Sequence, residues 1–329
     1  MIPSLLYRFR WLSADKIDRE LAALADSYLY ASPFSAMNDP MEAFYETGGP
    51  GDRIVDAMLS PSGKTTADLY RLLDETIAKF ALISFTGTCE ALPLWAYYAN
   101  NFAGMCLEFD TRRLFVSDFQ GEKLREVTYA RHAAPSLSLN DFGPGRLDEA
   151  IISRISRKRI EWAHEKEWRF VTGTVGSKHY LDDALRRVYL GPRIDPVHAT
   201  RVCDVLKRRP VEVLQGKVRG FELEFHKLQG PAPLVDCERV GAGRFSPADD
   251  LYAEPELRGF FGASYDKLLE ECRTTALRPN MEQLAGIDIS GVKRDVVYFH
   301  TTFKLRNGRE VYEKRYFNKQ MELIEGDAA

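Results

Sequence analysis

The sequence predicts an α+β protein: a mixed sheet with flanking helices over residues 1–230, and an accessory C-terminal region over 231–329 that carries a β-hairpin. Segments that alternate apolar and polar residues, as half-buried strands do, are interspersed with segments whose apolar residues recur at helical spacing. A stretch rich in proline and glycine at 229–249 then marks the expected boundary between the two parts.

The first half of the chain is expected to alternate between strands and helices. Leu5–Trp11 alternates apolar and basic residues, which predicts a strand with Arg8 and Arg10 on one face. Ser13 is expected to cap a helix over 15–25. Further strands are predicted at 28–30, 80–85 and 105–109, helices at 67–79 and 94–100, a turn at 34–44, and a loop at 48–64.

The second half begins with a predicted strand at 126–129 and a loop at 135–145. A long helix at 147–164 is expected to lead directly into an extended segment at 165–171. A strand at 188–190, helices at 196–208 and 265–272, and a hairpin of 295–305 with 310–317 complete the prediction, and Asn307-Gly308 is expected to form a two-residue turn.

Charged residues are concentrated where the extended segment begins. If the chain is extended there, Glu165, Glu167 and Arg169 share one face, and Trp168 and Phe170 occupy the other. Neighbours on one face lie about 6 to 7 Å apart, which is close enough to act on one small ligand. The same pattern is typical of a solvated sheet face, and the arginine could simply neutralise a half-buried carboxylate.

Composition narrows the class of protein. A chain of 329 residues with 45% hydrophobic and 28% charged residues is typical of globular proteins. Lys and Arg total 45 against 48 Asp and Glu, so an anionic partner must be met by a local basic patch. Five cysteines without Cys-x-x-Cys spacing argue against a disulfide framework and a zinc knuckle. No apolar run approaches the ~18 residues of a membrane span, so no membrane partner and a cytoplasmic location are expected.

Several short motifs have both a functional and a structural interpretation. Gly63-Lys64-Thr65 matches the end of a phosphate-binding loop, but Met58 stands where the first glycine is needed, which favours a solvated turn. Trp95 and Tyr98 either pack a short helix on the core or stack on a nucleotide base. Asn38-Asp39 either contributes to a site or only builds a turn.

Two groupings suggest other chemistry. Glu108 and Asp110 end one predicted strand and Glu165 and Glu167 begin another, and four such carboxylates could bind Mg²⁺ for phosphodiester cleavage. The C-terminal hairpin interleaves basic and aromatic residues, a pattern typical of nucleic-acid or partner binding and also of an amphipathic hairpin. The basic residues of the hairpin are Lys304, Arg306, Arg309, Lys314 and Arg315, and its aromatic residues are Phe303, Tyr312, Tyr316 and Phe317.

A series of motifs in fixed order resembles a bacterial family called domain of unknown function 2971. The resemblance covers about residues 5–225 and implies positions of interest without an activity. The motifs are Tyr7-Arg8-Phe9, Phe34, Asn38-Asp39-Pro40-Met41-Glu42, Ser84-Phe85, Leu94-Trp95-Ala96-Tyr97-Tyr98-Ala99, Gly104, Leu107-Glu108-Phe109-Asp110, Lys158, Trp162, Glu165, Glu167, Arg169 and Leu190-Gly191-Pro192.

A second resemblance supplies chemistry. An arginine on the first strand, then Ser84-Phe85-Thr86, then Glu165-Lys166-Glu167 resembles ADP-ribosyltransferases of the Arg-Ser-Glu type, which carry an arginine, a Ser-Thr-Ser and a Glu-x-Glu in this order. Here Phe85 and Thr86 replace the middle threonine and the last serine. The resemblance implies an ADP-ribosyltransferase-like core and NAD as substrate.

The resemblance also implies roles. Arg8 or Arg10 would grip the pyrophosphate of NAD, and Ser84 would brace the nicotinamide ribose. Glu167 would hold the ribose hydroxyl and stabilise positive charge on the sugar as nicotinamide leaves, while Glu165 would orient the acceptor nucleophile. The other residues expected to bind the nucleotide are Thr86, Trp95, Tyr98, Asn38, Asp39 and Arg169.

The expected function is therefore that of an NAD-using transferase or NAD glycohydrolase of the toxin or phage-defence kind, with protein, nucleic acid or water as acceptor and no bound metal. Two alternatives stay open. One is a metal-dependent nuclease that uses the four carboxylates. The other is a non-enzymatic module that binds a nucleotide, or a partner through the C-terminal hairpin.

Overall fold

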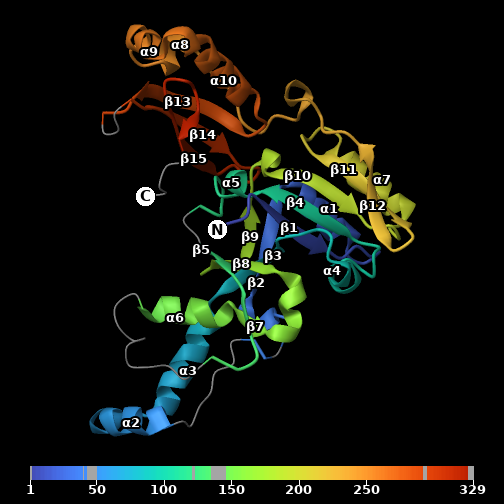
Figure 1. Ribbon diagram of the computed structural model, residues 1–329, viewed down its shortest axis with the longest axis vertical. Helices are drawn as coiled ribbons and strands as arrows, with labels where there is room; N and C mark the ends of the chain where they lie inside the picture. Colours follow the sequence, from blue (N-terminus) through green and yellow to red (C-terminus); the bar gives the residue numbers. More distant parts are fainter. Residues whose placement is uncertain are drawn as a thin grey trace.

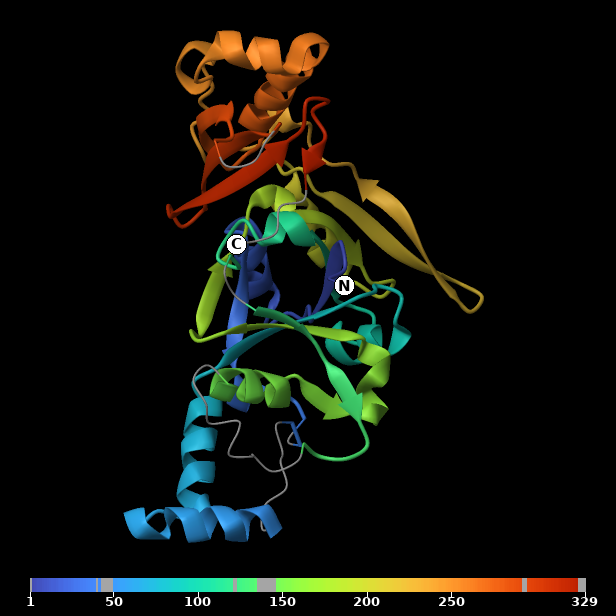
Figure 2. The ribbon, with the colours of Figure 1, turned by 60° about the vertical axis from the view of Figure 1, so that its left-hand side comes forward.

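The computed structural model describes residues 2–39, 41–42, 50–120, 123–134, 146–291 and 295–324. The protein is α+β, as predicted from the sequence, with a ten-stranded mixed sheet, a four-stranded antiparallel sheet and helices packed on both (Figure 1). The four-stranded sheet and its helices lie at one end of the molecule, and helices α2 (Pro50–Leu59) and α3 (Thr66–Ile77) project at the other (Figure 2).

The large sheet contains most of the predicted strands. Apart from the parallel pair β10–β11, its strands pair antiparallel. Their order is β12 (Glu222–Gln229), β11 (Glu212–Arg219), β10 (Leu185–Leu190), β4 (Met105–Asp110), β1 (Leu5–Arg10), β3 (Ala81–Thr86), β2 (Tyr28–Pro33) and β9 (Gly176–His179), while β8 (Glu167–Thr172) pairs with β3 and with β5 (Lys123–Glu126).

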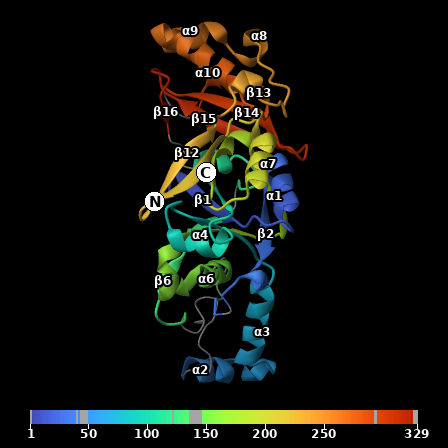
Figure 3. The same cartoon turned by 90° about the vertical axis from the view of Figure 1, so that its right-hand side faces the viewer.

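Helices cover the sheet because each presents an apolar stripe to it. α1 (Ile17–Ala25) and α7 (Pro196–Leu206) lie side by side and contribute Leu21 and Val202 to the main core (Figure 3). α3 and α6 (Arg146–Ile155) enclose a smaller core, and α4 (Leu92–Tyr98) encloses a third. The short helical segments are η1 (Phe34–Ala36), η2 (Ser60–Ser62), α5 (Thr111–Leu114), η5 (Asp182–Ala184), η6 (Leu234–Asp236) and η7 (Gly262–Ser264).

The C-terminal region has its own sheet. This sheet has the order β13 (Met281–Ile289), β14 (Val297–Lys304), β15 (Glu310–Phe317) and β16 (Leu323–Ile324), and α8 (Pro247–Asp250), α9 (Glu254–Phe261) and α10 (Tyr265–Leu277) pack beside it. The β14–β15 hairpin is present as predicted. Its loop is longer than two residues, because the last paired positions are Lys304 and Glu310. Within the loop, Gly308, with φ +85°, donates its backbone N–H to the carbonyl of Leu305 at 2.9 Å.

Other local predictions are also wrong. The expected loop at 48–64 contains α2, in which Ile54, Val55 and Met58 recur at helical spacing after a first-turn proline. Ser13 does not cap α1 with its side chain; the helix begins at Ile17, and the Ser13 carbonyl accepts that residue's N–H at 2.9 Å. The predicted helix 147–164 ends at residue 155 and continues as β7 (Arg157–Arg159) and η4 (Ile160–Glu165), with β7 paired to β6 (Thr128–Ala130). The expected loop at 135–145 lies outside the described residues.

Candidate functional site

A cavity of about 510 Å³ opens where the large sheet divides. β1 pairs with β3 at Tyr7↔Thr86, and β2 pairs with β3 at Ser32↔Leu82, so these two strands separate along one edge of β3. The volume lies within the usual range of small-molecule sites. The cavity is lined by Arg8, Arg10, Asn38, Ser84, Thr86, Tyr98, Glu165, Glu167 and Arg169, nine of the eleven site residues predicted from the sequence.

Strand register places the central wall of this cavity. Ser84 lies opposite Arg169, and Thr86 lies opposite Glu167, across the antiparallel pair β3–β8. Directly opposed residues share one face of a sheet, so these four side chains lie together. The alternate residues of both strands are buried in the main core. The two-residue period thus separates a polar face at the cavity from an apolar face beneath it.

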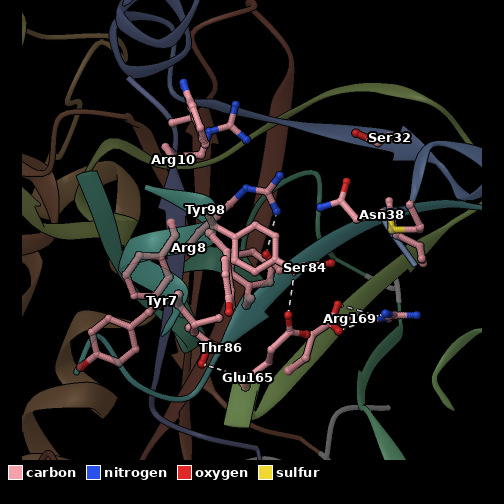
Figure 4. A pocket seen from close by; sticks show the side chains of 18 of the residues that line it. Tyr7, Arg8, Arg10, Ser32, Asn38, Ser84, Thr86, Tyr98, Glu165 and Arg169 are labelled. Atoms are coloured by element: carbon pink, nitrogen blue, oxygen red, sulfur yellow. Dashed lines mark hydrogen bonds and ion pairs between the residues drawn. The ribbon is translucent and has the colours of Figure 1, made fainter. Parts of the chain in front are cut away.

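Arg8 reaches this wall because the strands separate. The Arg8 guanidinium donates to the Ser84 carbonyl at 2.7 Å (Figure 4). The Arg8 Nε is buried without a hydrogen-bond partner, and among the described residues no carboxylate forms an ion pair with this side chain. Burial and the neighbouring Arg10 lower the pKa of Arg8. A partly buried cation without a counter-ion can be stabilised by an anionic ligand.

The other cations at this end are partly neutralised. Arg10 binds Glu20 through two hydrogen bonds, of 2.7 and 2.6 Å, and Arg19 binds the same carboxylate at 2.9 Å. Lys16 lies over the ring of Trp11 and also lines the cavity. Four cations therefore face one carboxylate at this end of the cavity.

Carboxylates dominate the opposite end (Figure 4). Lys158 Nζ lies 2.6 Å from Glu165, 3.2 Å from Glu167 and 3.3 Å from Glu42. Arg169 binds Glu167 at 2.9 Å and Glu42 at 2.8 Å. Three acids thus share two buried cations, and this end keeps an excess of negative charge.

Burial and ion pairing have opposite effects on the pKa values of the acidic cluster. Burial alone would raise the pKa of Glu167, but Arg169 and Lys158 lower it on balance. Burial raises the pKa of Glu42 despite the same two cations. Burial would lower the pKa of Lys158, but the surrounding carboxylates raise it on balance. Glu167 and Lys158 are therefore charged at neutral pH.

The two glutamates of the Glu-x-Glu motif do not lie on one strand. Glu165 ends the 3₁₀ segment η4, Lys166 has a left-handed backbone with φ 44°, and β8 begins at Glu167. The prediction that residues 165–171 are continuously extended is wrong at this point. The two carboxylates are brought together instead by Lys158, and Glu165 also accepts from the Tyr98 hydroxyl at 2.7 Å.

Two predicted ligand-binding residues lie elsewhere. Trp95 is fully buried, donates its ring N–H to the Cys89 carbonyl at 2.7 Å and packs against Phe9, so it belongs to the core. Asp39 is buried and accepts the Met41 backbone N–H at 2.9 Å, which fixes a turn. Neither lines the cavity. Both side chains have the structural role that was the alternative interpretation.

The four-carboxylate grouping is not formed. Glu108 accepts from the Tyr189 hydroxyl at 2.6 Å and pairs with Arg187 at 3.0 Å, and Asp110 caps α5. Within the described ranges, no group of three or more potential His, Cys, Asp or Glu ligands could hold a metal ion. Gly63-Lys64-Thr65 is likewise structural, because Thr65 caps α3 through a capping box with Asp68.

All three arginines of the C-terminal hairpin form ion pairs with carboxylates of the protein. Arg306 binds Asp182 and Glu238, Arg309 binds Asp118, and Arg315 binds Glu271. Phe303 and Phe317 are buried. The interleaved basic and aromatic pattern therefore serves largely to attach this hairpin to the rest of the protein.

Sequence reasoning missed Lys158 and Glu42 as site residues. Both stand within the motifs of the family resemblance, which was the available signal. Lys158 was expected inside a long helix, where it could not meet both glutamates. Its position on β7 depends on the helix ending at Ile155, which the local spacing did not predict.

Residues 94–170 match the family model described as protein of unknown function, DUF2971. This segment runs from α4 to β8 and contains Tyr98, Lys158, Glu165 and Glu167, so the family resemblance is confirmed over the acidic end of the cavity. The family description gives no activity. No curated protein and no solved structure matches the chain. None of the described helices combines the length and apolar character needed to cross a bilayer.

Proposed function

We propose that the cavity binds NAD and that the protein cleaves its nicotinamide–ribose bond, transferring ADP-ribose to an acceptor or to water. The supporting observation is that Arg8, Ser84 and Glu167 line one cavity from neighbouring strands β1, β3 and β8. These are the residues that the resemblance to ADP-ribosyltransferases selects. The bacterial toxin or phage-defence setting and the cytoplasmic location belong to the same proposal.

The distribution of charge suits this ligand. NAD carries a pyrophosphate with two negative charges and a positively charged nicotinamide ring at the other end of one ribose. The cationic end of the cavity, where neither Arg8 nor Lys16 has a carboxylate ion pair among the described residues, fits the pyrophosphate. The acidic end, with Glu165 and Glu167, fits the nicotinamide ribose.

Each side chain has a defined part in the reaction. The bond between the ribose C1′ and the nicotinamide nitrogen breaks, and its electron pair leaves with nicotinamide. Glu167 stabilises the positive charge that develops on the sugar, and an acceptor oxygen then bonds to C1′. The proton of that oxygen passes to the Glu165 carboxylate or to water. Ser84 hydrogen-bonds Glu167 and helps to fix it in place.

Nicotinamide release from NAD, measured by chromatography, tests the activity. Wild-type protein should release nicotinamide, and Ser84→Ala should slow release about tenfold or more through lost positioning. Glu167→Gln should abolish release. Because it also breaks ion pairs with Arg169 and Lys158, this variant must be compared with Arg169→Lys, which disturbs the same network and keeps the carboxylate. Equal loss in both variants would assign Glu167 a structural role.

A nucleotide-binding module without catalysis is the second candidate. It is favoured by the pairing of Glu165 and Glu167 with Lys158 and Arg169, which already neutralises both carboxylates in part. Calorimetric titration separates the two functions. NAD binding without nicotinamide release identifies the module, and neither binding nor release contradicts both proposals.

A further inference from the structure

A second cavity, of about 290 Å³, lies beside the cationic end of the NAD cavity. The residues that line both cavities are Arg10, Arg19, Glu20 and Ser32. In Figure 4, Arg10 and Ser32 lie at the end of the NAD cavity away from Glu165. The volume of the second cavity is near the small end of the range for ligand pockets, which suits one part of a ligand better than a whole one.

The lining of the second cavity is mainly apolar and comes from strands of the large sheet and from α1. Leu24 of α1 and Met105 and Leu107 of β4 are buried there. Tyr28 and Tyr30 of β2 also line it and share one face of their strand. Buried apolar side chains and tyrosine rings favour a flat group with apolar faces, and a nucleotide base is such a group.

One polar group of this lining is unsatisfied. The Tyr180 side chain is fully buried, and its hydroxyl has no hydrogen-bond partner among the described residues. Its ring packs edge-on against Phe109 at 5.1 Å between centroids, which fixes its position. Burial raises the pKa of Tyr180, so the hydroxyl keeps its proton and can donate it in a hydrogen bond. A ligand acceptor in the cavity would remove the cost of leaving this buried hydroxyl unpaired.

We propose that the second cavity holds the adenine base of NAD, with the Tyr180 hydroxyl donating to a ring nitrogen of the base. This inference rests on the proposed function, in which the pyrophosphate binds at the cationic end and the nicotinamide ribose at the acidic end. The adenosine half must then lie beyond the pyrophosphate, where the second cavity begins. Adenine suits the lining because its ring nitrogens accept hydrogen bonds and its two faces are apolar.

Glu20 lies where the two cavities adjoin, so it is placed to bind the ribose between adenine and the pyrophosphate. Its Oε1 accepts from Arg10 and Arg19, while its Oε2 accepts from Arg10 Nε at 2.7 Å. A carboxylate oxygen can accept more than one hydrogen bond. A ribose hydroxyl can therefore donate to Oε2 without displacing either arginine.

Calorimetric titration with the two halves of NAD tests the assignment. AMP carries adenine, and nicotinamide mononucleotide carries the other base. Tyr180→Phe removes the hydroxyl and keeps the ring, so it should weaken AMP binding about fivefold and leave binding of nicotinamide mononucleotide unchanged. Its melting temperature should equal or exceed that of wild type, because the hydroxyl has no partner to lose among the described residues.

Two neighbouring alanines of α1 offer a matched pair of variants. Ala23 lines the second cavity, whereas Ala22 is exposed and does not. Ala23→Leu should occupy space needed by the base, weaken AMP binding about tenfold or more and raise the KM for NAD in nicotinamide release. Ala22→Leu makes the same change of side chain on the same helix and should alter neither quantity. Thermal melting checks that both variants fold.

Three outcomes would overturn the adenine subsite: no AMP binding by wild-type protein, AMP affinity equal to wild type in either Tyr180→Phe or Ala23→Leu, or a loss of affinity for nicotinamide mononucleotide in place of AMP. AMP binding that depends on both residues, without nicotinamide release from NAD, supports the subsite and contradicts NAD cleavage alone. Nicotinamide release with an unaltered KM in Ala23→Leu contradicts the subsite and leaves NAD cleavage standing.

Discussion

At the scale of single residues, the two arginines of β1 show how pairing distinguishes a structural cation from a ligand-binding one. Arg10 is held by two hydrogen bonds to the buried Glu20. Arg8 donates to a backbone carbonyl and keeps a buried Nε without a partner. Of two arginines on one strand, Arg10 therefore contributes to stability, and Arg8 remains available to a ligand.

Arg8→Gln should abolish NAD binding while leaving the free energy of unfolding within about 1 kcal/mol of wild type, because no described carboxylate loses its ion pair. Arg10→Gln should lower the free energy of unfolding by about 1 to 2 kcal/mol, since it leaves Glu20 with Arg19 alone. Calorimetric titration and urea denaturation measure the two effects. The assignment is contradicted if Arg8→Gln binds NAD normally.

At the scale of elements, the strands could be predicted from the sequence, but the path of the chain from α6 to β8 could not. β1 and β8 each show a two-residue alternation and β3 follows a short apolar run, all visible locally, so Arg8, Ser84 and Glu167 were placed on the correct strands. α6 ends at Ile155, and the residues that follow pair with β6 and bring Lys158 to Glu42 and Glu165. Local spacing carries no information on such contacts.

The Lys166 turn between the two glutamates is a test at this scale. A left-handed backbone costs a non-glycine residue about 1 kcal/mol, and more for a β-branched one. Lys166→Gly should therefore raise the melting temperature or leave it unchanged. Lys166→Val should lower it and move Glu165 away from Lys158, with loss of nicotinamide release. A valine variant as stable and active as wild type would show that the turn is not required.

At the scale of the whole molecule, buried arginine–aspartate contacts join the C-terminal region to the large sheet. Asp182 is fully buried and binds Arg209 at 3.0 Å and Arg306 at 2.8 Å, and its neighbour Asp183 binds Arg278 at 2.7 Å and also Arg113. The sequence indicated the two regions through the Pro- and Gly-rich stretch. The sequence could not show that arginines of the hairpin form ion pairs between the two regions.

Acid should weaken this contact. Burial alone would raise the pKa of Asp183, but Arg278 and Arg113 lower it below its ordinary 3.8 on balance. Its stabilising contribution is therefore complete above about pH 4 and is lost as pH falls through the lower folded pKa. Asp183→Asn should reduce the free energy of unfolding by about 3 kcal/mol at pH 7.

Urea denaturation of wild type and Asp183→Asn at pH 7 and at pH 3 checks this contribution. The difference between the two proteins should shrink at the lower pH. A difference of equal size at both pH values would mean that the charge of Asp183 does not hold the C-terminal region.

The most direct test of the central claim is a crystal structure of the protein soaked with NAD. The account predicts the pyrophosphate within hydrogen-bonding distance of the Arg8 guanidinium, and the nicotinamide ribose beside Ser84 and Glu167. An empty cavity at saturating NAD, or a nucleotide bound with its pyrophosphate away from Arg8, would contradict it.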